Sequence, residues 1–251
     1  MKHDAPKLLE MAFQKRSWQP QMICFSGDTD CYQPVERNLQ LTRRCLEVFL
    51  HYRNPLSIIT KNALVARDLD LLRQLAGLGL VQVTLSITSL DSELIRVMEP
   101  RTSSPHKRLE TVEILASNGI PVRVNVAPII PGLTDEEMPG ILEKAAACGA
   151  KYAAYTVLRL PGSVRQLFLD CLKRELPEST SKVINRIKAV RGGDLNDSRW
   201  GVRMKGEGEY AKAIRQLFKL NCRRYGLNKN EVHFSVEHFR RVPRKQLEMF
   251  G

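Results

Sequence analysis

The sequence predicts an α/β fold built on a parallel sheet, because short apolar runs alternate with amphipathic segments up to Leu160. Gly119 and Gly149 each follow an amphipathic segment and precede an apolar run, as glycines at helix C-termini do. Thr134 and Glu137 form a capping box that predicts the start of another helix. The apolar runs are rich in Val and Ile and lack clean alternation, which is typical of strands buried on both faces. The five expected strands are residues 21–25, 56–60, 81–88, 121–130 and 152–158.

Four segments between these strands carry an apolar face, which predicts helices packed on the sheet. After residue 160 the pattern changes to helices at 163–173, 181–191 and 207–226, with Pro177 separating the first two. Five βα units are too few for a closed barrel of eight, so an open partial barrel or a doubly wound sheet is expected. In both folds ligands bind at the carboxyl ends of the strands. The four apolar faces are Leu39, Leu46, Phe49 and Leu50, then Leu71, Leu72, Leu75 and Leu78, then Leu109, Val112, Leu115 and Ala116, and finally Met138, Ile141, Leu142 and Ala145.

The composition is ordinary except for its charge: 251 residues carry a formal net charge of +12. Such an excess fits nucleic acid, an anionic cofactor or a solvated basic surface. The charge is spread along the chain and is concentrated only at Arg43, Arg44 and in residues 240–245, which favours the solvated surface. The mixed, charged start is not a signal peptide, and no apolar run approaches the ~20 residues of a membrane span. A cytoplasmic protein with no membrane partner is therefore expected.

The cysteines do not form a metal site in the sequence. No CxxC or CxxxCxxC occurs, so no metal ligand is assigned and reduced, mostly buried thiols are expected. No Ser-His-Asp order, glycine-rich phosphate loop or paired-carboxylate signature stands out either, so no catalytic residue is assigned. The six cysteines are Cys24, Cys31, Cys45, Cys148, Cys171 and Cys222.

Polar residues follow the first three expected strands, where a ligand should bind. After the first strand, hydroxyl and carboxylate groups could hold an ammonium or a ribose, or could cap a βα turn. Lys61, after the second strand, could pair with a carboxylate or phosphate, or could be solvated. Ser86, at the end of the third, could hold a polar group of a ligand or satisfy loop backbone. The residues after the first strand are Ser26, Gly27, Asp28, Thr29 and Asp30.

Two further segments complete this set. Arg101 could clamp a carboxylate in two-point fashion, or could form a surface ion pair with Glu99. Residues 127–132 contain two prolines, which predict a rigid apolar ledge with exposed carbonyls. A flat heterocycle could lie on this ledge, or the segment could be no more than a stiff loop.

Taken together, these segments resemble a known family. The motifs are SGDTDCYQPVER, ITKNALVARDLDLL, VTLSITSLDSELIRVMEPRTSSPHKRLETVEIL and NVAPIIPGLTD, in that order. They resemble radical S-adenosylmethionine (SAM) proteins grouped with spore photoproduct lyase, often labelled DNA repair photolyases. VRGGDLNDSRWGVRMKGEGEYA resembles the C-terminal part of one bacterial subfamily, so the resemblance covers about residues 5–228.

The resemblance implies a partial (β/α)6 TIM-like barrel, here without its first βα unit and with a C-terminal helical extension. It divides the chain into a radical SAM core at 1–160, the extension at 161–228 and a basic tail at 229–251. It also implies SAM bound at the strand ends. The implied SAM-binding residues are Ser26, Gly27, Asp28 and Thr29 at the methionine ammonium, Lys61 at its carboxylate with Ser86 beside it, and Ala127, Pro128 and Ile129 under the adenine. Arg101 joins this set from its own chemistry, as the candidate carboxylate clamp.

One departure from the family pattern decides the chemistry. The family's CxxxCxxC, which holds a [4Fe–4S] cluster, would lie upstream of residues 2–9 and is not in this sequence. The expectation is a radical SAM enzyme that is inactive alone: a truncated gene product, a fragment whose cluster-bearing N-terminal piece is separate, or a degenerate relative. One alternative is a non-catalytic remnant that binds SAM or nucleic acid. Another is an ordinary TIM-barrel-like enzyme that acts on a small anion through Lys61 and Arg101.

Overall fold

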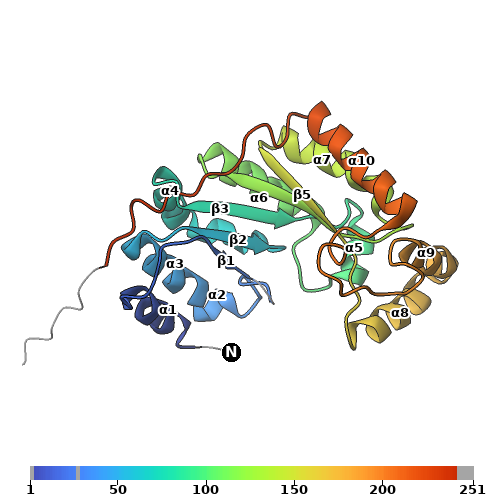
Figure 1. The fold of residues 1–251 in the computed structure, drawn as a ribbon, viewed down its shortest axis with the longest axis horizontal. Helices are drawn as coiled ribbons and strands as arrows, with labels where there is room; N and C mark the ends of the chain where they lie inside the picture. The colour runs from blue at the N-terminus through green and yellow to red at the C-terminus, as the bar shows by residue number, and fades with distance from the viewer. Residues whose placement is uncertain (1–2, 27–28, 242–251) are drawn as a thin grey trace, which may run out of the picture.

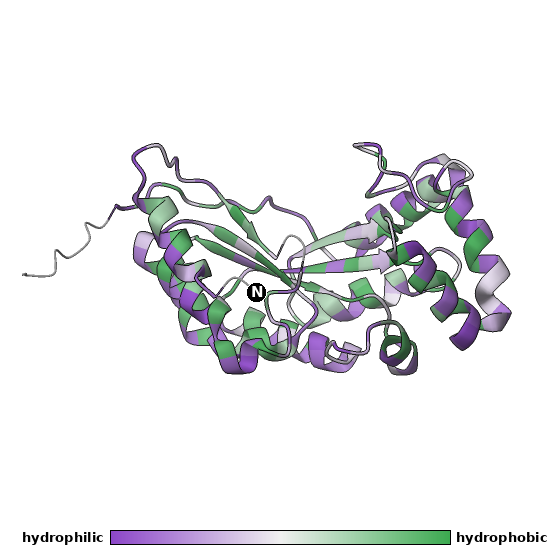
Figure 2. Cartoon of the chain, turned by 90° about the horizontal axis from the view of Figure 1, so that it is seen from below, coloured by the Kyte–Doolittle hydropathy of each residue, from purple (hydrophilic) through white to green (hydrophobic). Residues whose placement is uncertain are grey.

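The structure, a computed structural model, describes residues 3–26 and 29–241. Its centre is a five-stranded parallel sheet in the order β1-β2-β3-β4-β5, so each strand pairs with the one before it in the chain. Parallel neighbours need a crossover, and helices on one side of the sheet supply it (Figures 1 and 2). The strands are β1 (Ile23–Phe25), β2 (Leu56–Thr60), β3 (Val81–Ser86), β4 (Val122–Ile129) and β5 (Tyr152–Val157).

The helices follow the predicted alternation and add a segment before the first strand. That segment, α1, packs against α3 and buries Phe13 in the core. The helices are α1 (Ala5–Gln14), α2 (Glu36–Leu39), α3 (Leu41–Tyr52), α4 (Leu69–Gly77), α5 (Ser92–Met98), α6 (Pro105–Ser117), α7 (Met138–Ala147), α8 (Val164–Glu175), α9 (Pro177–Ala189) and α10 (Gly208–Arg224), with 3₁₀ turns η1 (Ala63–Asp68) and η2 (Asp135–Glu137).

Of the two helix-end signals in the sequence, the glycine stops are confirmed and the capping box is not. Gly119 and Gly149 adopt φ angles of 76° and 91° after α6 and α7, which confirms the predicted glycine stops. The predicted capping box is wrong. The Thr134 hydroxyl accepts from the Ile130 amide at 2.9 Å, while the Glu137 carboxylate accepts from Leu90 N at 2.7 Å. These side chains tie the end of β4 and the loop after β3 together instead of capping a helix.

The two faces of the sheet differ more than the sequence suggested. All six residues of β3 are buried, as the prediction of doubly covered strands requires. In β4 and β5, however, buried residues alternate with half-buried ones over most of each strand. Val81, Val83 and Leu85 join the core under the helices, so the intervening Gln82, Thr84 and Ser86 lie on the opposite face.

The last three helices pack in two groups. α10 lies against α7, and its Ala211 and Ile214 join the main core. α8 and α9 pack on one another over a second cluster that includes Leu160 and Ile187. Pro177 occupies the first turn of α9, where its missing N–H would have had no helical partner.

The first part of the expected basic tail is held against the sheet. Asn228 N donates to Lys151 O at 2.9 Å, Ser235 N to Gly79 O at 3.0 Å and Arg240 N to Tyr52 O at 3.0 Å. These carbonyls lie just before strands begin, so residues 228–241 cross the end of the sheet opposite to the predicted ligand site (red trace in Figure 1).

The two arginines of this segment donate hydrogen bonds to backbone carbonyls elsewhere in the chain. Arg240 Nε donates to His51 O at 2.9 Å, and Arg241 Nη2 to Trp18 O at 2.7 Å. The Arg241 guanidinium also lies 5.6 Å from the Phe239 ring centroid. Arg244 and Lys245, named with them as a basic cluster, lie outside the described residues.

Candidate functional site

The loop after β1 is fixed to the end of β2 by one carboxylate. Asp30 accepts hydrogen bonds from Thr60 Oγ1 and Lys61 N, both at 2.7 Å, and from Tyr32 N at 2.9 Å. The loop also closes on itself, because Ser26 Oγ accepts from Cys31 N at 2.9 Å and donates to Thr29 O at 3.0 Å. These bonds hold the hydroxyls of this loop at the carboxyl end of the sheet.

Lys61 belongs to a charged cluster at the same end. Its ammonium pairs with Glu99, which also accepts from Arg108 Nη2 at 2.7 Å and from Thr88 Oγ1 at 2.5 Å. Arg108 is fully buried and donates further to Ser86 O and Ser103 O, both at 2.8 Å. The cluster thus joins the ends of β2 and β3 to the start of α6.

The charges of this cluster leave an unbalanced cation at the surface. Burial would raise the pKa of Glu99, but the adjoining charges of Lys61 and Arg108, with the hydrogen bonds from Lys61 and Thr88, lower it below its usual value. One carboxylate therefore faces two cations. The Lys61 side chain remains 28% exposed, whereas Glu99 is 8% and Arg108 0% exposed. An incoming anion would meet Lys61, which has three donors and uses one on Glu99.

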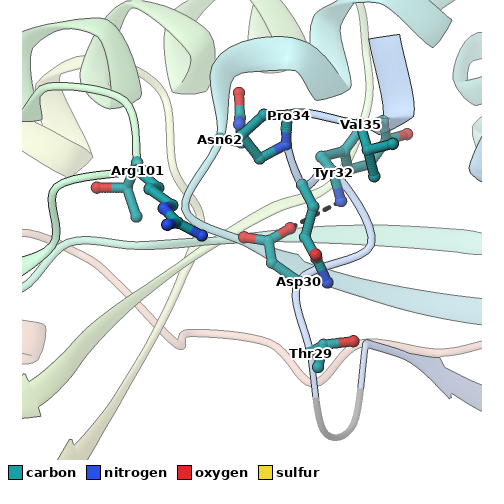
Figure 3. Close-up of a pocket in the computed structure, with 9 residues that line it drawn as sticks. Thr29, Asp30, Tyr32, Pro34, Val35, Asn62 and Arg101 are labelled. Carbon is teal, nitrogen blue, oxygen red and sulfur yellow. Dashed lines mark hydrogen bonds between the residues drawn. The ribbon is translucent and has the colours of Figure 1, made fainter. Parts of the chain in front are cut away.

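Two cavities adjoin this cluster. The smaller, about 250 Å³, is lined by four of the predicted residues together with Asp30, Ile59 and Thr60. The larger, about 670 Å³, shares Thr29 and Asp30 and extends to Asn62 and Arg101 (Figure 3). Both sizes fall in or near the range of small-molecule sites. The predicted residues around the smaller cavity are Ser26, Thr29, Lys61 and Ser86.

The other predicted residues lie apart from the smaller cavity. Arg101 is exposed and faces the loop after β1 across the larger cavity (Figure 3). Its alternative interpretation, an ion pair with Glu99, is wrong, because the recorded ion pairs of Glu99 are with Lys61 and Arg108. Gly27 and Asp28 lie outside the described residues.

The predicted ledge differs from expectation. Its carbonyls are not free: Ala127 O accepts from Thr88 Oγ1 at 2.9 Å, and Ile129 O accepts from Leu158 N at 2.8 Å. Ala127 and Ile129 are buried, so Pro128 presents the more accessible side chain of the three. The expectation of exposed carbonyls therefore fails at Ala127, whose carbonyl is bound by Thr88, and at Ile129, which pairs with Val157 of β5.

The described residues contain no cysteine group that could hold a metal. Within residues 3–26 and 29–241, no group of three or more His, Cys, Asp or Glu side chains could hold a metal. The six cysteines are free thiols. Burial raises the pKa of the Cys31 thiol to about 12, so the cysteine nearest the site is a poor metal ligand and nucleophile.

Three residues that organise the site were not assigned these roles from the sequence. Asp30 follows directly on the assigned Asp28 and Thr29, yet its partners on β2 lie 30 and 31 residues away. Glu99 was considered only as a partner of Arg101, whereas it pairs with Lys61, 38 residues earlier, and with Arg108. Sequence spacing carries no sign of such a contact.

The comparisons with known proteins agree with this geometry. The sequence model of the Radical SAM superfamily matches residues 4–145. The chain belongs to the radical SAM superfamily. An uncharacterized protein of Mycobacterium tuberculosis is 33% identical over 72% of this chain and 54% of its own length. An uncharacterized protein of Methanocaldococcus jannaschii is 36% identical over 46% of this chain and 43% of its own length. The chain thus spans about half the length of the curated relatives it matches.

Solved structures show the same fold. A variant of spore photoproduct lyase superposes with a TM-score of 0.64 at 17% identity, over 92% of this chain and 66% of that one. Another variant, with bound AdoMet and dinucleoside spore photoproduct, gives a TM-score of 0.62 at 17% identity over the same shares. The predicted partial TIM-like barrel is confirmed as the fold of this radical SAM protein. In the part of the chain that the structure describes, no helix is long and apolar enough to cross a membrane.

Proposed function

We propose that this chain is the SAM-binding body of a radical SAM enzyme of the spore photoproduct lyase-like group. The observation that carries the proposal is Lys61, the partly exposed cation of the cluster with Glu99 and Arg108, which lines a polar cavity. A methionine carboxylate in that cavity would accept a charge-assisted hydrogen bond from the Lys61 ammonium. The hydroxyls of Ser26 and Thr29 line the same cavity and would face the methionine ammonium.

The remaining assigned residues extend this proposal along the strand ends. Ser86 lines the cavity beside Lys61 and would contact the methionine end of SAM. The adenine would lie against Pro128, with Ala127 and Ile129 supporting it from the buried side. Arg101 would reach the ligand from the larger cavity.

The described residues do not fit the cluster that the superfamily implies. When bound, a [4Fe–4S] cluster supplies the electron for reductive cleavage of SAM, and it needs neighbouring thiolates. The described residues contain no such ligand group. We therefore propose that the cluster ligands come from a segment outside this chain, and that the chain alone is inactive.

The outer edge of β1 is the proposed docking place for that segment. Among the described residues the β1 backbone pairs with β2 alone, and Cys24 at its centre is exposed. Met22, just before the strand, is 44% exposed. An unpaired edge beside an exposed apolar side chain is a template for one more strand. Nucleic acid is proposed as a further partner, supported by the net charge of +12.

Calorimetric titration of the chain with SAM tests the site. We expect weak binding, and Lys61→Ala should reduce it at least tenfold, because a charge-assisted bond is worth about 1.5–3 kcal/mol. Lys107→Ala is the matched control, since Lys107 is exposed and pairs with Glu110 on the surface of α6. Equal SAM affinity of Lys61→Ala and the wild type would reject the assignment of Lys61.

A further inference from the structure

The face of the sheet away from the helices is polar and holds an unpaired arginine. We call the side chains of Ser57, Gln82, Thr84, Ser86, Arg123 and Asn125 the polar face. The strand register places Thr84 beside Arg123, and Ser86 beside Asn125. Ser86 lines the small cavity at Lys61. The polar face therefore runs from that cavity down β3 and β4.

Arg123 has no partner in the part of the chain that the structure describes. Its Nε is buried without a hydrogen bond, and no ion pair reaches its guanidinium. Burial lowers its pKa, and the titratable neighbour that acts on it is Tyr152, its register partner on β5. No carboxylate offsets the charge. An unpaired, half-buried cation costs free energy that an apolar side chain at this position would not.

Neighbouring polar atoms are unpartnered as well. Gln82 is 1% exposed, yet its Nε2 makes no hydrogen bond, and the Oδ1 of Asn125 is also buried without a partner. Unsatisfied buried polar atoms are rare in folded proteins and need an explanation. Here three of them belong to residues on adjacent strands of one face, and two of the three atoms, Gln82 Nε2 and Arg123 Nε, are donors that an anion could satisfy.

We infer that Arg123, assisted by Gln82, binds an oxyanion of the enzyme's substrate, a carboxylate or a phosphate, on the polar face. The inference rests on the proposed function, because it places the substrate beside the SAM cavity. A guanidinium pairs with two oxygens of either anion at once, which fixes the orientation as well as the position of the substrate. Asn125, between Arg123 and Ser86 on this face, lies where a polar edge of the same substrate would meet its amide.

Anion titrations of the full chain test the inference, with inorganic phosphate and acetate as probes and chloride at matched ionic strength as the reference. The thermal midpoint of the wild type should rise with phosphate, acetate or both, and the anion that saturates at the lower concentration identifies the source. In the Lys61→Ala background, which removes the cation of the SAM cavity, Arg123→Met should abolish this rise, while the midpoint without anion stays equal or increases. Arg73→Met is the control, because Arg73 is exposed on α4.

The outcomes separate this inference from the proposed function. Arg123→Met should bind SAM as the wild type does, whereas Lys61→Ala should lose SAM and keep the anion response that Arg123→Met removes. A purely structural arginine would instead show a lower midpoint in Arg123→Met with the anion response retained, and this result would overturn the inference. So would a wild type that responds to neither anion beyond chloride.

Discussion

The two outer edges of the sheet differ in the hydrogen-bond partners of their backbone groups. At β5, the backbone is closed by side chains and a loop: the Asn228 amide bonds Ala153 N and O at 2.9 and 3.0 Å, and Lys205 Nζ bonds Tyr155 O at 2.6 Å. Val157 N donates to Met204 O at 2.9 Å, and Arg191 donates to Val157 O at 3.0 Å. At β1, the structure records no such partner for the edge among the described residues.

The contrast distinguishes a β5 edge whose backbone is hydrogen-bonded from a β1 edge for which the described residues supply no such partner. Open edges are a hazard that proteins cover unless something else pairs with them. The C-terminal extension supplies Asn228, Lys205 and Arg191, which complete β5 without adding a strand. β1 receives no comparable cover, which is why we place the docking of a cluster-bearing segment there.

The largest effect should come from Arg191, which is 2% exposed. Arg191→Ala removes the donors to Val157 O and to Leu158 O, the latter at 2.6 Å. Leaving two buried carbonyls unpaired should lower the free energy of unfolding by about 2–4 kcal/mol. Urea unfolding measures it, with Arg165→Ala on the exposed surface of α8 as the control. A loss as small as that of the control would show that the β5 edge does not depend on this cover.

A smaller, pH-dependent effect should come from Lys205. Burial, and secondarily the charge of Arg215, lowers its pKa from the ordinary 10.5 to about 8. Between these values the unfolded chain holds a proton that the folded chain has released, so the stability attributable to Lys205 rises from pH 8 to 10.5. The free energy of unfolding of the wild type, measured in urea, should therefore rise relative to that of Lys205→Met across this window. A constant difference between the two proteins would refute the shift.

The smallest effect should occur at the other edge. Cys24 is exposed and its strand pairs on one side, so Cys24→Lys should change the free energy of unfolding by less than about 0.5 kcal/mol. Urea unfolding of Cys24→Lys and Arg191→Ala in one series compares the two losses of free energy directly. A loss approaching that of Arg191→Ala would mean that the β1 edge matters as much for the stability of this chain as the β5 edge does.

Much of this fold is local and was predictable. The strand at Leu56–Thr60 has the predicted bounds, because a short β-branched run ends there at a polar residue. Lys61 and Ser86 line one cavity, because parallel strands bring their carboxyl ends to one edge. The alternation in β4 was also visible, since Val122, Val124 and Val126 flank Arg123 and Asn125, but the apolar residues after it hid the period.

The rest depends on contacts that sequence spacing does not encode. The pairing of Glu99 with Lys61 and Arg108 joins a loop to a strand end and a helix. The bonds of Arg240 and Arg241 to the carbonyls of His51 and Trp18 connect the two ends of the chain. Local charge patterns predicted a solvated or nucleic-acid-binding cluster, and both arginines are exposed, but their bonds to distant carbonyls left no sign in the sequence.

We propose that this chain supplies the SAM-binding body of a radical SAM enzyme without the ligands of its cluster. Iron and acid-labile sulfide per chain can be measured after anaerobic reconstitution with iron and sulfide, with SAM binding followed on the same sample. SAM should bind weakly, while iron and sulfide should stay far below one cluster per chain. A stoichiometric [4Fe–4S] cluster on this chain alone would contradict it.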